Sequence, residues 1–235
     1  MGRRHEGVGR ALRRALGPEF VLPEVEPREG GRSLLMNARR QRVFEYVWNH
    51  PCSHLRRISR ELRIPAQSLR WHLLRLRDGG ILDSRTVKGK SVYFAPWAVR
   101  DEDVPMFASL SNGMRGRIVR FVADQKQTTQ SDIFHALKTY QQAVLPPLEE
   151  LTRLGLLRTW KENGKRFYVL GDSYARLHGN YVAAAPDRMD RLLAVLKHDG
   201  VSPKVHSRGD HEVQVQVSNG VQKSVLRLRL APMMR

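Results

Sequence analysis

The chain has 235 residues, enough for two or three small domains, and its 41 Lys and Arg residues against 23 Asp and Glu residues give a formal net charge of +18. This charge favours a polyanionic partner, although it also serves solubility and is shared by ribosomal, membrane-surface and DNA-binding proteins. One cysteine, Cys52, excludes an intrachain disulfide framework and an all-cysteine zinc site, and no apolar run approaches the roughly 20 residues that span a bilayer.

Residues 1 to 33 mix Gly, Pro, Arg and Glu with weak periodicity, which predicts a basic and mostly disordered tail. Residues 8 to 16 have the spacing of a short amphipathic helix. Five arginines of the tail have two interpretations. They form a basic arm that reaches into a minor groove of DNA, or they belong to a solvated tail without a binding role. These arginines are Arg3, Arg4, Arg10, Arg13 and Arg14.

Residues 34 to 98 are predicted to begin with two short helices. Asn37 is a good cap for the first helix, which has apolar residues at helical spacing and ends near His50. Ser53 is the predicted cap of the second helix, which ends before Pro65 because the residue that precedes a proline is biased away from helix.

A third helix and a hairpin follow in the same segment. The third helix, 66 to 78, buries its leucines and ends at two glycines, which adopt a left-handed backbone conformation at little cost in free energy. Two strands, 81 to 87 and 91 to 95, flank the sequence Lys-Gly-Lys, which predicts a hairpin with a basic tip.

Residues 37 to 94 match residues 112 to 169 without a gap, at a constant offset of 75 residues. Matching apolar classes support the identities, so the pattern indicates two copies of one small unit. The identical pairs include Asn37 with Asn112, Arg40 with Arg115, Ile58 with Ile133, Gln67 with Gln142, Leu73 with Leu148, Gly89 with Gly164, and Tyr93 with Tyr168.

Three helices followed by a hairpin form the plan of a winged helix-turn-helix domain. The run Leu69-Arg70-Trp71-His72-Leu73-Leu74-Arg75-Leu76, followed by Gly80-Ile81-Leu82, resembles ArsR-like regulators, especially archaeal tandem winged-helix regulators. Residues 49 to 62 strengthen the resemblance, since such regulators open the second helix with an Asn-Pro-Gly-like turn, here with Cys52 in place of the glycine. The resemblance covers 36 to 96 well and 112 to 170 moderately, and it implies DNA binding.

In a unit of this kind the third helix enters the major groove. Arg can form two hydrogen bonds to guanine and Gln two to adenine, so polar residues on the exposed face of this helix could read bases. The alternatives are an ordinary solvated face and, for the tryptophan, packing under the wing or on the neighbouring copy. The predicted base-reading residues are Gln67, Ser68, Arg70 and Trp71.

Basic residues are concentrated in the elements that flank the third helix. Residues 37 to 96 contain 13 basic and four acidic residues, which predicts phosphate contacts and an affinity that falls steeply with salt. The predicted phosphate-binding residues are Arg56, Arg57, Arg60, Arg75, Arg85, Lys88 and Lys90 in the first copy and Lys161, Lys165 and Arg166 in the wing of the second.

Residues 99 to 111 are predicted to form an acidic linker that keeps its own backbone off DNA. The second copy, 112 to 171, departs from the pattern in its third helix. Pro146 and Pro147 predict a helix that is interrupted or begins late, and Glu149 and Glu150 would be repelled by phosphate on the reading face. We expect this copy to contact phosphates through its wing or to pair domains.

Residues 172 to 235 predict a small helix-plus-sheet module, with a helix over 186 to 197 and alternating strands joined at the turn Ser218-Asn219-Gly220. About 50 residues are marginal alone, so packing on the second copy or on a second chain is expected. Homodimerisation is one role. A module without a pocket would favour dimerisation or added basic surface over ligand sensing, and the sequence shows no evident small-molecule site.

Catalytic motifs are absent from the sequence: there is no phosphate-cradling loop, zinc-protease motif or nucleophile elbow. His50, Cys52 and His54 cluster, but a fourth ligand at structural zinc spacing is missing, so no metal is predicted. We expect a non-enzyme without a cofactor.

The sequence thus predicts a mainly α chain with small β wings, of class α+β, in which tandem winged helix-turn-helix units precede the C-terminal module. The main hypothesis is a cytoplasmic, double-stranded-DNA-binding transcription regulator with no membrane contact. The alternatives are an abundant nucleoid-associated architectural protein with little sequence preference, and a scaffold whose winged helices bind proteins.

Overall fold

The computed structural model describes residues 33–111, 113–209 and 212–230, which form a mainly helical chain with small antiparallel sheets. This is the α+β class that the sequence predicts. The predicted N-terminal tail, its short helix and its basic arm lie outside the described residues. Within the described part, no helix has both the length and the apolar composition that crossing a bilayer requires.

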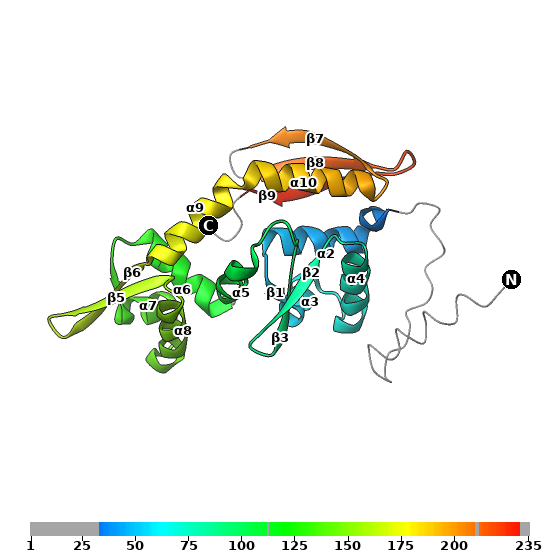
Figure 1. The fold of residues 1–235 in the computed structure, drawn as a ribbon. Coiled ribbons are helices and arrows are strands. Elements are labelled where there is room, and N and C mark those ends of the chain that lie inside the picture. The colour runs from blue at the N-terminus through cyan, green and yellow to red at the C-terminus, as the bar shows by residue number, and fades with distance from the viewer. Residues whose placement is uncertain (1–32, 112, 210–211, 231–235) are drawn as a thin grey trace.

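The first three-helix unit, α2 to β3, follows the predicted order (Figure 1). The side chain of Asn37 accepts hydrogen bonds from the backbone N–H groups of Arg39 and Arg40, both at 3.1 Å, which confirms it as the cap of α2. The elements are η1 (Leu34–Met36), α2 (Ala38–Asn49), β1 (Ser53–His54), α3 (Leu55–Leu62), α4 (Ala66–Asp78), β2 (Asp83–Val87) and β3 (Lys90–Phe94).

The predicted cap of the second helix, Ser53, is wrong. Ser53 lies in the short strand β1, where it pairs with Tyr93, and its hydroxyl donates to the carbonyl of His50 at 2.8 Å. Helix α3 begins at Leu55, and its N-terminal cap residue His54 makes no side-chain capping bond. Pairing with β3 holds this segment extended, a non-local cause that local cap chemistry does not reveal.

The hairpin tip has the predicted turn. Lys88 and Gly89 have φ angles of 50° and 71°, as a two-residue turn with left-handed backbone at both positions requires. Strand β3 pairs with both β1 and β2, so the sheet order is β1-β3-β2.

The second three-helix unit, α6 to β6, repeats this element order, with a sheet of order β4-β6-β5. Helices α6 and α8 and strand β4 each begin 75 residues after α2, α4 and β1. The elements are α6 (Gly113–Asp124), β4 (Thr128–Thr129), α7 (Gln130–Ala136), α8 (Gln141–Arg153), β5 (Leu157–Glu162) and β6 (Lys165–Leu170).

Helix α8 is continuous, so the predicted interruption at its two prolines is wrong. Pro146 and Pro147 lie inside the helix, where each removes one backbone donor. The carbonyl that would accept from residue 146 belongs to Gln142, an exposed residue, and Pro146 is itself exposed. Water can therefore satisfy that carbonyl, while Val144, Leu148 and the other apolar residues hold the helix against the core.

The predicted acidic linker 99–111 is a structured bridge between the units. It contains η2 (Asp101–Asp103) and the helix α5 (Val104–Leu110), and most of the α5 side chains are buried. Phe107 belongs to a core cluster that joins Val92 and Phe94 of the first hairpin to the second unit. The acidic side chains of this segment form ion pairs within the chain. The buried side chains of α5 pack against both units and fix their relative position.

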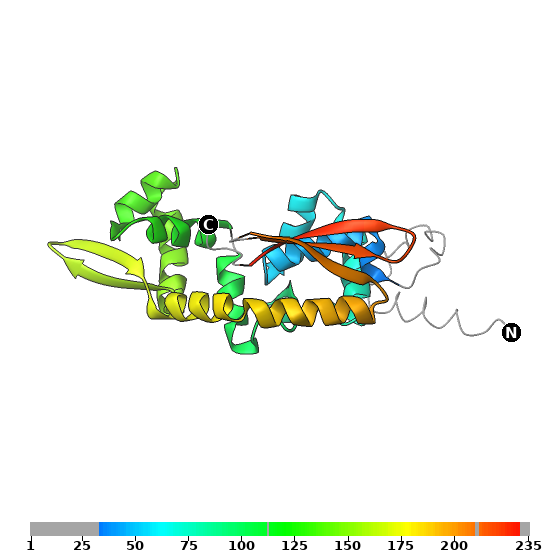
Figure 2. The ribbon, with the colours of Figure 1, turned by 90° about the horizontal axis from the view of Figure 1, so that it is seen from above.

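Two helices and a sheet follow the second unit: α9 (Asp172–Ala183), α10 (Ala185–His198), β7 (Ser202–Arg208), β8 (Glu212–Ser218) and β9 (Lys223–Arg229), with strand order β7-β8-β9. Helix α10 matches the predicted helix, whereas α9 was not predicted. Figure 2 shows α9 and α10 as one nearly continuous rod along the molecule. The N–H of Ala184 bonds to Asn180 and the N–H of Arg188 bonds to Ala184, which carries the helix across the junction.

Strand β9 of the C-terminal sheet packs on α2, and α10 packs on β7 within the same core cluster, so these elements cover the first unit and not the second copy. The indole N–H of Trp48 donates to the carbonyl of Arg229 at 3.1 Å, and the amide of Gln41 donates to that of Val225 at 2.9 Å. Helix α2 has buried side chains on more than one side, because α3 and α4 cover only part of it. The sheet closes the remaining side.

Candidate nucleic-acid interface

The first unit has a basic groove, defined by the residues around a hollow of about 550 Å³ between α3, α4 and the β2–β3 hairpin. In Figure 1, α3 and the hairpin tip lie on the side of α2 opposite to the C-terminal sheet. The sheet therefore leaves this face uncovered. The lining residues are His54, Leu55, Arg56, Arg57, Arg60, Arg70, Lys90, Ser91, Tyr93, Ser111 and Gly113.

Five of the predicted DNA-contacting cations meet in this groove: Arg56, Arg57, Arg60, Arg70 and Lys90. Arg57 is oriented by its Nε, which donates to the Tyr46 hydroxyl at 3.2 Å. Arg60 forms an ion pair with Glu61 at 3.0 Å, but both side chains are exposed, so water and salt screen that pair. The groove therefore concentrates positive charge where a phosphate chain could lie.

The predicted base-reading residues occupy the N-terminal half of α4. Gln67 and Arg70 are exposed, and Ser68 is half-buried. Trp71 is also half-buried, and the guanidinium of Arg40 lies 5.8 Å from the centre of its ring. A cation at this distance over an indole face is attracted by the ring electrons. Trp71 thus packs against α2 of its own unit, and not under the wing or on the neighbouring copy, the two packing alternatives that the sequence left open.

Two predicted phosphate contacts of the first wing have acidic partners within the chain. Arg85 Nη2 lies 2.9 Å from Asp101 Oδ2, and Lys88 Nζ lies 2.5 Å from Glu150 Oε2. Successive side chains of a strand point to opposite faces, so Arg85 lies on the face opposite to Tyr93 and the groove. Neither cation lines the groove, and the acids that hold them come from other segments of the chain.

The other predicted cations lie outside the groove. Arg75 is exposed on the C-terminal half of α4. Lys161, Lys165 and Arg166 are exposed at the tip of the β5–β6 hairpin, which Figure 1 shows pointing away from the first hairpin. The two wings do not form one continuous basic surface with the groove.

Glu150, which the sequence places on the reading face of α8 as a group that phosphate would repel, lies in an ion pair network between the two units. Its carboxylate binds Lys88 of the first wing, Arg115 of α6 at 2.6 Å and the Ser109 hydroxyl at 3.2 Å. Burial alone would raise the pKa of Glu150, but the Lys88 hydrogen bond and the charges of Arg115 and Lys88 outweigh it and hold the pKa below its usual value. Glu150 thus ties the first hairpin to the second unit.

Sequence reasoning missed six groove residues, which are His54, Leu55, Ser91, Tyr93, Ser111 and Gly113. His54 Nδ1 lies 3.3 Å from the Ser91 carbonyl. Burial and the nearby charges of Lys90, Arg115 and Arg57 lower the pKa of His54 despite this hydrogen bond. Burial raises the pKa of Tyr93, although Arg77 and Arg70 lie near it. The alternation of β3 was visible in the sequence, but its pairing with β1, which brings His54 to the groove, was not.

The cluster of His50, Cys52 and His54 does not resemble a metal centre. Cys52 is fully buried, and burial raises the pKa of its thiol, whereas a metal ligand must be a thiolate. The His50 ring stacks on Tyr46, with 4.5 Å between ring centres. Among the described residues no group of three or more His, Cys, Asp or Glu is arranged to hold a metal ion.

No protein-family profile matches the chain. Its sequence is 24% identical over 159 residues, or 68% of the chain, to an uncharacterized HTH-type transcriptional regulator of Methanocaldococcus jannaschii. The chain spans 40% of the length of that protein. This match confirms the resemblance to helix-turn-helix regulators that the sequence motifs indicate.

Two solved structures of HlyU from Vibrio cholerae, one of them reduced, are also similar, each with 26% sequence identity. The similarity covers 29% and 32% of this chain and 72% and 87% of the HlyU chains. Both TM-scores are 0.28, so these superpositions carry no conclusion about the interface.

Proposed function

We propose that the chain is a DNA-binding transcription regulator with two consecutive winged helix-turn-helix units, residues 34–98 and 112–171, followed by the module 172–235. The observation that carries this proposal is the basic groove, where cations of α3, α4 and the hairpin converge beside the exposed face of α4. The sequence similarity to a protein described as a transcriptional regulator supports the same function.

In this mechanism α4 enters the major groove and reads bases with Gln67, Ser68 and Arg70. Gln67 and Arg70 are exposed on adjacent turns of the helix, as a helix that reads base edges needs. Trp71 borders this face, and the cation over its ring favours a role in supporting α4 rather than in reading.

The remaining groove cations bind phosphates and fix the register of α4 on the duplex. Arg56, Arg57 and Arg60 lie on α3, and Lys90 lies at the start of β3, so they flank α4 from two sides. Arg75 extends this surface along α4. Arg85 and Lys88 contribute less, because binding a phosphate would compete with their carboxylate partners.

The second unit has a supporting role. Through Glu150 it holds the tip of the first hairpin, so it sets the angle of the wing relative to α4. Its own wing cations, Lys161, Lys165 and Arg166, lie at the end of an exposed hairpin and contact phosphate farther along the duplex.

The test is selection of bound duplexes from a random-sequence pool by the full chain, at low and near-physiological salt. One enriched motif supports a specific regulator. Retention without sequence preference would favour the nucleoid-associated architectural alternative, and no retention at low salt would overturn DNA binding and leave the protein-binding scaffold.

Variants of α4 then test the reading residues. Arg70→Ala is expected to cost about 1–3 kcal/mol of binding to the enriched motif and to relax preference at one position, and Gln67→Ala is expected to relax another. Lys197→Ala is the matched control, because Lys197 is an exposed cation on α10, away from the groove. Unchanged affinity and preference in both α4 variants would refute the assignment of these residues.

A further inference from the structure

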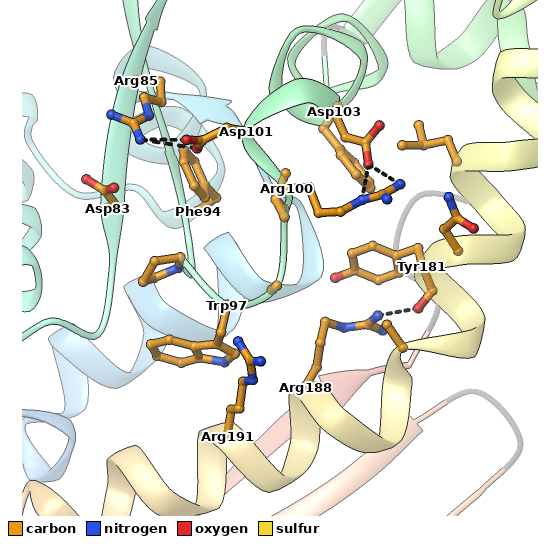
Figure 3. Close-up of a pocket in the computed structure, with 17 residues that line it drawn as sticks. Asp83, Arg85, Phe94, Trp97, Arg100, Asp101, Asp103, Tyr181, Arg188 and Arg191 are labelled. Carbon is orange, nitrogen blue, oxygen red and sulfur yellow. Dashed lines mark hydrogen bonds and ion pairs between the residues drawn. The ribbon is translucent and has the colours of Figure 1, made fainter.

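The opposite face of the β2–β3 hairpin borders a second cavity, of about 420 Å³, which we call the junction pocket. It lies where the first hairpin, the segment after β3, and the helices α5, α9 and α10 meet (Figure 3). Its volume falls in the range of small-molecule sites, about 300–1,000 Å³. Sequence reasoning could not find it, because its walls come from two stretches that are distant in the chain, 83–107 and 177–191.

Three buried polar atoms of the pocket lining have no hydrogen-bond partner among the described residues: Trp97 Nε1, the Tyr181 hydroxyl and Arg188 Nε. Tyr181 and Arg188 are only 5% and 3% exposed. Figure 3 shows the Tyr181 hydroxyl directed into the pocket from α9, with the Arg188 side chain from α10 beneath the Tyr181 ring and its guanidinium turned toward the Tyr181 carbonyl. Buried polar groups are nearly always paired, and leaving one unpaired costs free energy.

Arg188 is a buried cation without a carboxylate partner among the described residues. Its guanidinium donates to the backbone carbonyls of Tyr181 and Leu230 and lies 3.6 Å from the centre of the Tyr181 ring. Burial lowers the pKa of Arg188, although the Tyr181 hydroxyl acts in the opposite direction. A buried charge without a counter-charge is costly, so an anion at this place would be favoured.

The acids of the lining do not supply that counter-charge. Asp101 pairs with Arg85, and Asp103 pairs with Arg100 at 3.0 Å and with Arg176 at 3.3 Å. The third acid, Asp83, accepts a hydrogen bond from the backbone N–H of the next residue. The lining thus has four arginines against three aspartates, and Arg188 and the neighbouring Arg191 are the lining arginines without an ion pair among the described residues.

We propose that the junction pocket binds a small organic carboxylate, with its carboxylate at Arg188 and Tyr181 and its apolar body against Phe94, Phe107 and Leu177. The donors recognise an anion, and the lining also includes apolar residues that can contact the body of the ligand. Trp97 donates its indole N–H to the same carboxylate. This site is separate from the basic groove, and its occupancy does not depend on the proposed DNA binding.

The experiment is calorimetry and thermal unfolding of the full chain without DNA, with a panel of small carboxylates that includes benzoate, phenylacetate and hexanoate. Each carboxylate is compared with its neutral amide, which has the same body and lacks the charge. The expected result is binding and a raised melting temperature with at least one carboxylate, and no effect of its amide.

Tyr181→Phe and Trp97→Phe are the informative variants. Each removes a donor that has no partner among the described residues, so the unliganded protein should keep its melting temperature. Each should weaken carboxylate binding by about tenfold, the value of one hydrogen bond to a charged group. Lys197→Ala should bind like the wild type.

Absence of binding across the panel would overturn the proposal. Equal binding of carboxylates and amides, or binding that both variants leave unchanged, would overturn it as well. These outcomes are independent of whether the chain binds DNA, so the proposed function and the junction pocket can fail separately.

Discussion

Neutralising the groove cations one at a time should change how steeply DNA binding depends on salt. The set is Arg56→Gln, Arg57→Gln, Arg60→Gln, Arg70→Gln and Lys90→Gln. Each phosphate that a cation neutralises releases counterions and contributes about 0.9 to the slope of log K against log salt. The four phosphate contacts of the groove, Arg56, Arg57, Arg60 and Lys90, contribute about −3.6 to the slope, and each of their variants should make it shallower by about 0.9, whereas Arg70→Gln should mainly relax base preference.

The structure predicts a contrast within the wing. Arg85→Gln and Lys88→Gln should change the slope by clearly less than about 0.9, because the wild-type cations are bound to Asp101 and Glu150. Over a fourfold rise in salt, a groove variant should lose about 3.5-fold less affinity than the wild type, whereas the two wing variants should stay close to it. Fluorescence anisotropy of a labelled duplex, titrated at several salt concentrations, measures both.

Lys197→Gln is the control for loss of charge alone, and its slope should equal that of the wild type. Slopes that fall equally in the groove, wing and control variants would mean that net charge rather than the groove binds DNA. Unchanged slopes in the variants of Arg56, Arg57, Arg60 and Lys90 would refute the interface.

Three further predictions concern stability, each measured by denaturant unfolding. Glu150→Gln should lower the free energy of unfolding by about 1–2 kcal/mol at neutral pH, because Lys88 and Arg115 lose a charged partner. The folded pKa of Glu150 is depressed, so this difference should disappear as the pH falls below about 4.3 and through the folded value, and a constant difference would contradict the ion pair network. Pro146→Ala should stabilise the protein by about 1 kcal/mol or more, since it restores a donor inside α8, and a loss of stability would show that the proline is favourable there. Trp48→Phe should cost about 2 kcal/mol through a lost hydrogen bond and lost volume, and an effect below about 0.5 kcal/mol would argue against the docking of β9 on α2.

The elements that depend on residues close together in the chain were predicted from the sequence. The helix 66 to 78 was predicted with its observed bounds, because its leucines have helical spacing and two glycines end it. Asn37 was predicted as a cap from its residue type and position, and the hairpin tip from its glycine. Five groove cations were also predicted, since α3, α4 and the hairpin are adjacent in this arrangement of elements.

The features that the sequence did not reveal depend on contacts between distant segments. Ser53 is extended because β3 pairs with it, and Lys88 is bound because α8 of the other unit brings Glu150 to it. The amino acids 104 to 110 include a proline and follow three acids, so the buried helix α5 was not visible in the charge pattern. The junction pocket forms only where the stretches 83–107 and 177–191 meet, and no spacing in the sequence predicts that contact.

The docking of β9 on α2 has a consequence for synthesis. The indole of Trp48 finds its acceptor 181 residues later in the chain, and the apolar side of α2 stays bare until that strand arrives. When the first unit has emerged from the ribosome, its core is therefore still incomplete and an apolar surface is exposed. The exposed apolar side of α2 favours aggregation until β9 covers it. A premature stop ahead of β9 should therefore produce an insoluble fragment rather than an independently folded N-terminal domain.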